Sequence, residues 1–320
     1  MSGTLSKHLR RASLITHALM ALALTVATPQ ASGQTLTLRL AQSTPMLWPQ
    51  TRIASEAGFW AKHGLVVNQT LFATGREAMQ ALLGGQADVA EVAPTPLVLA
   101  AFAGQPVRTF AVVARWSKWR VLVRVDRGIA SASQLKGKKV AIAVGTSSDL
   151  AFSYFLTQNG VSRSSIEIVN VSPPDMIPAL ESGSVDAINI WQPFTYEAET
   201  RLGPRIRGLS YTFTNNYLLL TTNDVATKNP EVLRRTLAVM KDADKVLTGD
   251  REKAIEWTAK AAGMKPETLR AVWAETELGT GVPDERVLNE MQQFADFAVK
   301  NKLVKEGAKV PDLKALFLVP

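Results

Sequence analysis

Hydrophobic and polar positions change along the chain in blocks that predict strands alternating with helices. The sequence "LTLRLAQ" (36–42) has the short apolar pattern of a strand, and "PQTRIASEAGFWAKHG" (49–64) has the 3.6-residue pattern of a helix that ends at Gly64. The same reading predicts further strands at 65–72, 87–92, 109–115, 119–125, 139–144, 166–171, 186–190 and 216–222. It predicts helices at 75–85, 94–104, from Ser148, at 174–183 and after Pro193, with a mostly helical remainder from Asn229. Such alternation indicates an α/β protein with mainly parallel sheets.

Two segments of this pattern resemble each other. "ALLGGQADVAEV" (81–92) and "ALESGSVDAINI" (179–190) share the frame A-L-x-x-G-x-x-D and lie 98 residues apart. Each combines a helix end, a glycine turn, an aspartate and a buried strand, and a proline-containing loop follows each. Chance is the alternative, because helix–glycine–strand corners are common. The matching context predicts two lobes of similar build, each with a loop at the carboxyl end of a strand, where open α/β sheets bind ligands.

The N-terminus has the pattern of an export signal. Residues 1–33 carry Lys7, Arg10 and Arg11 and no acidic residue, followed by an apolar run and small residues. The apolar run of about 14 residues is shorter than the roughly 20 that span a bilayer, which disfavours the alternative of a membrane anchor. We expect residues 1–33 to be a signal peptide cleaved near Ala31–Gly33.

Charge and residue usage exclude several functions. The net charge is +8, and removing the three N-terminal basic residues leaves +5 (8 − 3), which is small for 320 residues. No basic cluster is interleaved with aromatic residues, so we expect no nucleic-acid partner. The chain has no cysteine, and His63 is the only histidine after residue 33. We therefore expect no metal site, no cofactor and no enzymatic activity, and nothing in the sequence indicates an oligomer, so we expect a monomer.

Several segments resemble the type 2 periplasmic substrate-binding proteins of ABC importers, in the nitrate, sulfonate and taurine (NMT1-like) branch. The resemblance covers about residues 36–300, and its order and spacing are more specific than any one segment. It rests on "EAGFWAKHGLVV" (56–67), "GREAMQALLGGQADVAEVAPTPLVLA" (75–100), "SASQLKGKKVAIAVGTSS" (131–148), "PPDMIPALESGSVDAINIWQPF" (173–194) and "NPEVLRRTL" (229–237).

The resemblance implies two α/β lobes joined by two crossing strands, with the ligand cleft between them. Lobe 1 would comprise 35–121 and 213–320, and lobe 2 would comprise 122–212. Closure on the ligand would be a hinge motion. The protein would capture a small organic anion or zwitterion in the periplasm and deliver it to an ABC permease in the inner membrane.

The resemblance also implies which loops line the cleft. Carried over position by position, they are Ser43–Trp48, Thr74–Arg76, Pro94–Thr95, Arg115–Trp119, Thr146–Asp149 and Asn189–Gln192. The candidate ligand-binding residues within them are Ser43, Trp48, Gly75, Arg76, Pro94, Thr95, Arg115, Trp116, Thr146, Ser147, Ser148, Asp149, Asn189, Trp191 and Gln192.

Each of these candidates has a second interpretation. Thr146, Ser147 and Ser148 can seat an anion at a helix start or can serve only as helix caps. Asp149 would repel a sulfonate there, so it either complements the helix dipole or meets an amine of the ligand. Arg76 either forms a bidentate pair with an acidic ligand group or is a surface charge.

The tryptophans and Gln192 bear on the body of the ligand. Trp48, Trp116, Trp119 and Trp191 near one crevice would suit an apolar or aromatic ligand body, or some of them simply pack the interior. Gln192 stands where an acidic residue is expected in many relatives, and a neutral amide favours a ligand group that is not strongly cationic.

Three alternatives remain at this point. The ligand could be a thiamine-pyrimidine precursor or another aromatic ring compound. The protein could be a sensor that presents its ligand to a membrane kinase, which deletion would reveal as a lost transcriptional response instead of lost uptake. An enzyme related to the thiamine-pyrimidine synthases is disfavoured, because that family relies on His and Cys residues.

Overall fold

The computed structural model describes residues 34–43 and 48–320. The chain divides into a short unit, residues 1–34, and a unit over 35–320 that contains every helix and strand of the described residues. The expected signal peptide, 1–33, lies outside the described residues. Across the described part, no helix has both the length and the apolar character needed to cross a membrane.

Strands and helices alternate up to the first long strand. The elements are β1 (Leu36–Ser43), α1 (Gln50–Glu56), α2 (Phe59–Lys62), β2 (Leu65–Phe72), α3 (Gly75–Leu83), β3 (Val89–Val92), α4 (Pro94–Phe102) and β4 (Val107–Arg124). A second alternating series follows, with β5 (Lys139–Ile142), α5 (Ser147–Gln158), β6 (Glu167–Asn170), α6 (Pro173–Ser182), β7 (Ala187–Asn189) and α7 (Phe194–Leu202).

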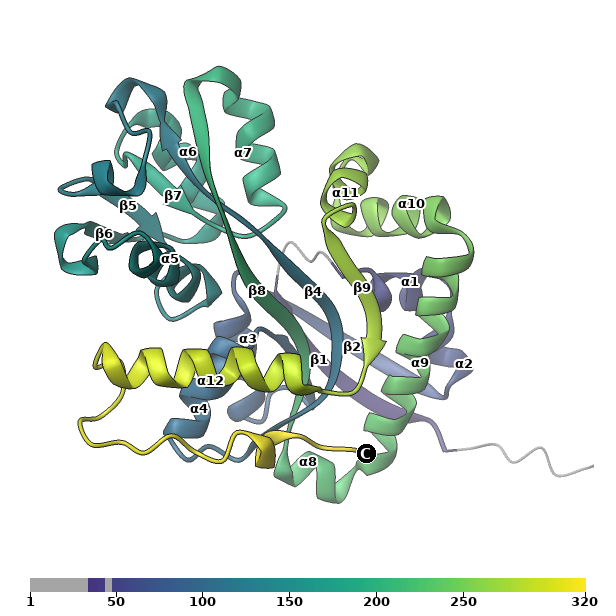
Figure 1. The fold of residues 1–320 in the computed structure, drawn as a ribbon. Coiled ribbons are helices and arrows are strands. Elements are labelled where there is room, and N and C mark those ends of the chain that lie inside the picture. Colours follow the sequence, from purple (N-terminus) through teal and green to yellow (C-terminus); the bar gives the residue numbers. More distant parts are fainter. Residues whose placement is uncertain (1–33, 44–47) are drawn as a thin grey trace, which may run out of the picture. The chain divides into compact units, whose positions relative to one another are not determined.

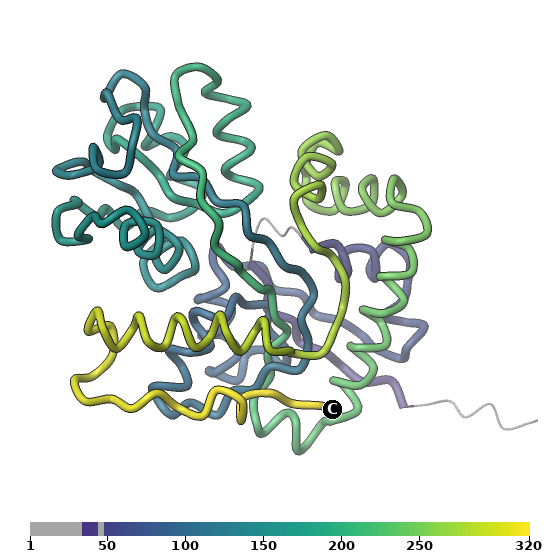
Figure 2. Tube along the Cα trace, viewed as in Figure 1, coloured from purple at the N-terminus to yellow at the C-terminus, as the bar shows by residue number. Residues whose placement is uncertain are grey.

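The C-terminal part is mostly helical, as the sequence predicts. It consists of β8 (Ile206–Thr222), α8 (Asn223–Lys228), α9 (Pro230–Gly249), α10 (Arg251–Ala262), α11 (Pro266–Trp273), β9 (Thr276–Gly281) and α12 (Glu285–Lys300). The long α12 packs against α4, although nearly 200 residues separate them, and both lie close together at the bottom of the trace (Figure 2).

The strands form one sheet in the order β2-β1-β3-β8-β4-β7-β5-β6, with β9 paired to β4. β1 is parallel to both β2 and β3, and we call these three strands the first strand group. β5 is parallel to both β6 and β7, and these three strands form the second strand group. The long strands β4 and β8 pair antiparallel between the two groups, and Figure 1 shows them running side by side from one group to the other. The predicted α/β class with parallel strands is confirmed.

Some element boundaries differ from the sequence prediction. The strands predicted at 109–115 and 119–125 are one continuous strand, β4, because irregularities in its pairing with β8, including one between Trp116 and Lys118, bend the strand without breaking it. The helix predicted at 49–64 is divided at Gly58, whose positive φ of 69° ends α1 and starts α2. Two elements were not predicted: strand β9, and helix α8, which precedes the helical part predicted from Asn229.

The buried apolar residues form separate clusters for the two strand groups. Along β5, Val140 and Ile142 join a cluster with Phe152 of α5, whereas the intervening Ala141 joins a cluster with Met176 of α6. Helices therefore cover both faces of the second group, as parallel strands require. The predicted lobe boundaries at 121/122 and 212/213 fall inside β4 and β8 and stay a prediction.

Candidate functional site

The loops that follow strands of both groups meet around one cavity. The cavity volume is about 30 Å³, close to the space that one water molecule occupies, and the cavity opens to solvent, so a larger ligand requires its two sides to move apart. From the first strand group and its loops, the predicted residues Ser43, Trp48, Gly75 and Arg76 line it. From the second, the predicted residues Thr146, Ser147, Trp191 and Gln192 line it.

The start of α3 holds Arg76 in place. Thr74 and Glu77 form a reciprocal capping box, in which the Glu77 N–H donates to Thr74 Oγ1 (3.3 Å) and the Thr74 N–H donates to Glu77 Oε2 (3.0 Å). Arg76 then extends toward the second strand group, where its Nη1 donates to the Val144 carbonyl at 3.2 Å. A Cβ at Gly145 would lie 3.2 Å from the same nitrogen, and Gly145 has a φ of 77°, so glycine is required for this approach.

The start of α5 brings Ser147 to the cavity. Thr146 is the N-cap: its Oγ1 accepts from the Ser148 N–H (3.2 Å) and donates to the Ala143 carbonyl (2.7 Å). The Ser147 hydroxyl has no side-chain hydrogen bond to any other described residue, although only 5% of the residue is exposed. Capping therefore occupies the Thr146 hydroxyl, whereas Ser147 lines the cavity with no side-chain hydrogen bond inside the described protein.

Ser148 and Asn189 bind each other instead of facing the cavity. The Ser148 Oγ donates to the Asn189 carbonyl, and Asn189 Nδ2 donates to the Ser148 carbonyl at 2.9 Å. The Asn189 Oδ1 accepts from the Tyr211 hydroxyl at 2.8 Å. Both Ser148 and Asn189 are fully buried, so these contacts fix the loop before α5 against the end of β7.

Asp149 is also occupied within the protein. Its Oδ1 pairs with Arg163 Nη2 at 2.7 Å, and its Oδ2 accepts from the Gly145 N–H at 3.0 Å. Asp149 does not line the cavity. Of the two interpretations of Asp149, the one in which it stabilises the helix start fits this geometry, and a ligand amine would have to displace one of these partners.

Aromatic side chains form the apolar wall of the cavity. The Trp48 and Tyr217 rings lie 3.9 Å apart between centroids, and both residues line the cavity. Trp191 packs against the cores of both strand groups. The Gln192 Oε1 accepts from the Tyr196 N–H at 3.0 Å, which orients the amide beside Trp191.

Glu91 is the main cavity residue that the sequence did not single out. It lies in β3, is 1% exposed, and its Oε2 accepts from Trp48 Nε1. Burial raises the pKa of this carboxyl to about 8, although the Trp48 N–H and the nearby Gln42, Arg52 and Thr51 act in the opposite direction. Ala93, Pro96 and Tyr217 also line the cavity and were not predicted.

The structure does not bring four other predicted residues into the cavity. Pro94 and Thr95 are buried in the first turn of α4, between the lining residues Ala93 and Pro96. Arg115 donates to Asn216 Oδ1 (2.8 Å) and to Asp284 Oδ2 (2.7 Å), which ties β4 to β8 and to the start of α12. Trp116 is 2% exposed and packs on Trp119 at 4.5 Å. These contacts are those of the protein interior.

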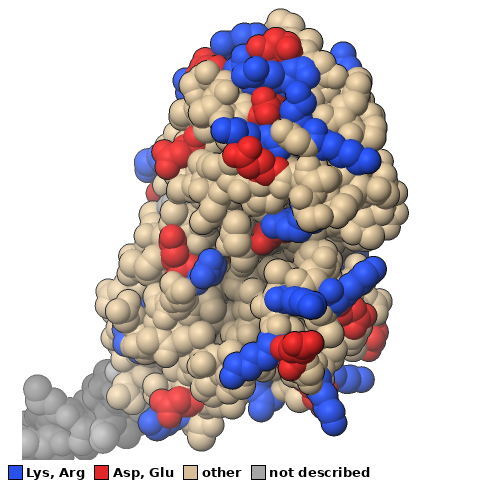
Figure 3. All heavy atoms as spheres, turned by 90° about the vertical axis from the view of Figure 1, so that its left-hand side faces the viewer, with Lys and Arg blue, Asp and Glu red and all other residues tan. Residues whose placement is uncertain are grey.

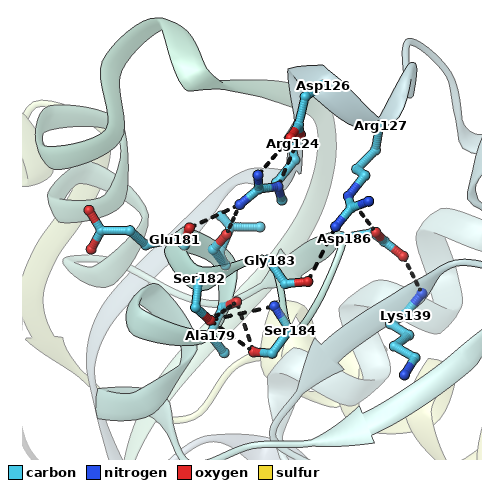
Figure 4. Close-up of polar contacts among 11 residues, drawn as sticks. Arg124, Asp126, Arg127, Lys139, Ala179, Glu181, Ser182, Gly183, Ser184 and Asp186 are labelled. Atoms are coloured by element: carbon cyan, nitrogen blue, oxygen red, sulfur yellow. Dashed lines mark hydrogen bonds and ion pairs between the residues drawn. The ribbon is translucent and has the colours of Figure 1, made fainter.

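Basic residues also gather at a second place. Figure 3 shows Lys and Arg side chains, with acidic ones between them, at the top of one face, over the second strand group. The close-up in Figure 4 shows that Arg124 Nη1 donates to the carbonyls of Leu180 (2.8 Å) and Glu181 (3.0 Å), while Nη2 pairs with Asp126 (2.6 Å). Arg127 pairs with Asp186 at 3.1 Å. Because these cations are already neutralised, this surface is a weaker candidate for an anion site.

The described residues contain no group of three or more His, Cys, Asp or Glu side chains placed to hold a metal ion. The single described histidine, His63, caps α2 and contacts Asp242 Oδ2 through Nε2 at 2.9 Å, away from the cavity. The side chains that line the cavity offer hydrogen-bonding, charged and aromatic groups.

The chain is similar in sequence to known binding proteins. A putative aliphatic sulfonates-binding protein of Escherichia coli (strain K12) is 29% identical over 243 residues, 75% of this chain and 76% of that one. A putative binding protein of Brucella abortus (strain 2308) is 28% identical over 217 residues, 66% of each chain, so the match spans just under two thirds of that relative's length.

Solved structures share the fold. The alkanesulfonate-binding protein of Xanthomonas axonopodis pv. citri bound to MOPS has a TM-score of 0.76 at 21% identity, covering 90% of this chain and 100% of that chain. The desulfurization enzyme DSZB has a TM-score of 0.64 at 16% identity, covering 88% of this chain and 96% of that chain. The predicted periplasmic-binding-protein fold is confirmed.

The family is established by its sequence profile. The profile described as NMT1/THI5 like matches residues 50–254, which is more than half of the chain and includes most of the cavity residues from both strand groups. The resemblance identified from the sequence segments is thereby confirmed. The chain belongs to the NMT1/THI5-like family.

Proposed function

We propose that this protein is the solute-binding component of an ABC importer and that it captures a small organic anion of the aliphatic sulfonate class. The observation that carries the proposal is the cavity at the ends of the parallel strands, where the Arg76 guanidinium and the Ser147 hydroxyl lie beside the wall formed by Trp48 and Tyr217. The E. coli relative, whose name states that it binds aliphatic sulfonates, supports the same class.

The cavity chemistry suits an anionic head and a short apolar body. A sulfonate offers three acceptor oxygens, which Arg76 and the hydroxyl and backbone N–H of Ser147 can satisfy together. The aromatic rings bury the carbon chain, and roughly 25 cal/mol is gained for each Å² of apolar surface removed from water. No bond has to form or break for these contacts.

Binding would be coupled to closure of two lobes. Arg76 belongs to the first strand group, and its hydrogen bond to the Val144 carbonyl reaches the second, so the residue spans the two sides of the cavity. In the proposed cycle, the protein closes on its ligand about β4 and β8, and a permease in the inner membrane opens it again. The mature protein would act in the periplasm after removal of residues 1–33, and as a monomer.

An enzymatic role is the second candidate, because the DSZB structure shares this fold. We propose a binding protein instead, since the described cavity residues whose side chains can act as a general acid or base are Glu91 and Tyr217, and they are only 1% and 5% exposed. The two roles differ in the fate of the ligand: a binding protein returns it unchanged after unfolding, and an enzyme returns a product.

A direct binding measurement tests the proposal. The purified protein should be titrated calorimetrically with ethanesulfonate, propionate, nitrate and the thiamine pyrimidine, and the bound ligand recovered and identified by mass spectrometry. The expected result is saturable binding of ethanesulfonate and its recovery unchanged. Binding of nitrate or of the pyrimidine alone would overturn the proposed class, and recovery of a desulfonated product would show an enzyme.

A further inference from the structure

The cavity contains one carboxyl group that has a free oxygen. Glu91 is 1% exposed, and its Oε2 accepts from Trp48 Nε1, whereas its Oε1 has no hydrogen-bond partner among the described residues. A buried polar atom without a partner costs free energy, and a ligand donor that pairs with it can recover that cost. The oxygen without a partner thus belongs to a residue that lines the cavity.

We propose that Glu91 is a specificity-determining residue, which binds an ammonium group of the ligand while Arg76 and Ser147 bind its anionic head. This inference rests on the proposed function and narrows its substrate to a short organic acid with a terminal amine. It assigns the amine to β3, in the first strand group, and not to Asp149 at the start of α5.

The charges around the cavity support a ligand with two opposite charges. Arg76 and Glu91 are the residues of opposite formal charge that line it, and they come from α3 and β3. A ligand carrying only a negative charge would meet Arg76 but would leave Oε1 of Glu91 without a partner. A zwitterion satisfies both, and charge complementarity of this kind gives specificity.

Asp149 is the competing candidate for the amine, and its contacts argue against it. Both of its oxygens are occupied, one by Arg163 at 2.7 Å and the other by the Gly145 N–H at 3.0 Å. Glu91 has one well-formed hydrogen bond, from Trp48 to Oε2; Gln42 and Thr51 lie close enough to lower the pKa of the carboxyl, but Oε1 has no hydrogen-bond partner among the described residues. The difference in hydrogen bonding, and not charge alone, favours Glu91.

The proton balance of this contact gives a measurable consequence. Burial raises the pKa of Glu91 to about 8, so the carboxyl is largely protonated at neutral pH. An incoming ammonium group favours the carboxylate, and the Glu91 proton leaves for the solvent. The other titratable groups that act on Glu91 or line the same cavity are Arg52 of α1, Arg76 of α3 and Tyr217 of β8; burial lowers the pKa of Arg52 and raises that of Tyr217.

The experiment compares two ligands that differ by one amine. The purified protein and its Glu91→Gln variant are titrated calorimetrically with 2-aminoethanesulfonate and with ethanesulfonate at pH 6, 7 and 8, in phosphate and in Tris buffers. We expect the wild type to prefer the aminosulfonate by about tenfold or more at pH 8 and less at pH 6. The difference in enthalpy between the buffers should show proton release for the aminosulfonate alone.

The variant separates a specific role from a structural one. Glu91→Gln keeps the size of the side chain and an acceptor for Trp48 Nε1, so it should lose at least about tenfold in affinity for the aminosulfonate and stay within about threefold for ethanesulfonate. Equal losses for both ligands, or none for the aminosulfonate, would overturn the inference. The proton release of the wild type tests it without any variant, should Glu91→Gln fail to fold.

Failure of the proposed function would look different. If neither sulfonate binds, the same titrations are run with β-alanine and propionate, which differ in the same way. A preference for β-alanine that Glu91→Gln abolishes would reject the sulfonate class and keep the role of Glu91. If ethanesulfonate binds and neither the sulfonate pair nor the carboxylate pair shows a preference for the amine, the proposed sulfonate binding stands and the role of Glu91 is overturned.

Discussion

Glu91 and Asn189 occupy corresponding positions in the two strand groups. Each lies three residues after an aspartate that hydrogen-bonds the backbone of the neighbouring strand. Asp88 donates its N–H to the Arg39 carbonyl at 2.8 Å and accepts the Arg39 N–H on Oδ2 at 2.8 Å. Asp186 makes the same two contacts with Lys139, at 2.8 and 2.9 Å. The 98-residue repeat in the sequence is therefore a repeat in the structure.

The two corresponding residues use their side chains differently. The Asn189 amide is satisfied on both sides, by the Ser148 carbonyl and by the Tyr211 hydroxyl, and thereby locks a loop. Glu91 is satisfied on one side only, by Trp48. One copy of the repeat has a structural residue at this position, and the other has a residue available to a ligand.

Replacing Arg76 by Ala should weaken binding of ethanesulfonate by about 1.5–3 kcal/mol, because a charge-assisted hydrogen bond to the head group is lost. Isothermal titration calorimetry measures the change. Arg201→Ala is the matched control, since Arg201 is an exposed arginine whose partner Glu181 lies away from the cavity, and its affinity should equal that of the wild type. An Arg76→Ala variant with unchanged affinity would leave Arg76 as a surface charge.

Ser147→Ala and Ser148→Ala form a pair that separates binding from folding. Ser147→Ala should reduce ethanesulfonate affinity several-fold with little change in stability, because its hydroxyl lines the cavity without a protein partner. Ser148→Ala should lower the free energy of unfolding by about 1–3 kcal/mol, because it removes the buried donor to the Asn189 carbonyl. Urea denaturation and calorimetry measure the two effects, and the reverse pattern would contradict the assignment.

The sequence predicts the fold and eight of the twelve described residues that line the cavity, for physical reasons. Alternating short apolar runs and amphipathic helices indicate parallel strands, and ligand loops follow at their carboxyl ends. Gly75, Arg76, Thr146 and Ser147 all lie in such loops and reach the cavity. The start of a helix near the cavity can be predicted from the local sequence, because particular residue types are preferred at helix N-caps and glycine is preferred in tight turns.

The sequence could not predict which side chains pair with each other, because the tertiary structure brings the partners together. Asp149 forms an ion pair with Arg163, 14 residues away in the sequence. Arg115 forms an ion pair with Asp284, 169 residues away. Glu91 lies inside the buried strand β3, whereas the sequence analysis looked for ligand contacts in the loops that follow strands. The repeat contained a usable clue, since it aligns Glu91 with Asn189, a residue that was predicted.

Asp149→Asn should change stability and not ligand choice. The variant weakens the pairing with Arg163, so we expect a lower melting temperature, while the ratio of affinities for 2-aminoethanesulfonate and ethanesulfonate stays that of the wild type. Thermal denaturation and calorimetry give the two quantities. A selective loss of aminosulfonate affinity would transfer the amine contact from Glu91 to Asp149.

Glu290 should make stability depend on pH in a direction that a substitution can isolate. It lies in α12, is 3% exposed, and its Oε2 accepts from the backbone and side-chain N–H groups of Asn216. Burial raises its pKa from 4.5 to about 8, although Asn216 and Arg115 oppose the shift. Between these values the unfolded chain releases the proton and the folded chain keeps it, so this residue's contribution to stability falls as pH rises from about 4.5 to 8.

Glu290→Gln mimics the protonated side chain at every pH. We expect the variant and the wild type to have similar free energies of unfolding at pH 5, and the variant to be more stable at pH 8.5, on the order of 3–5 kcal/mol if the whole shift is expressed. Urea denaturation at both pH values measures the difference. Glu285→Gln, an exposed position on the same helix, is the control for removing a carboxylate from α12. If the Glu290→Gln difference is the same at both pH values, the buried carboxyl titrates as an ordinary glutamate and the Asn216 contacts, not burial, set its protonation.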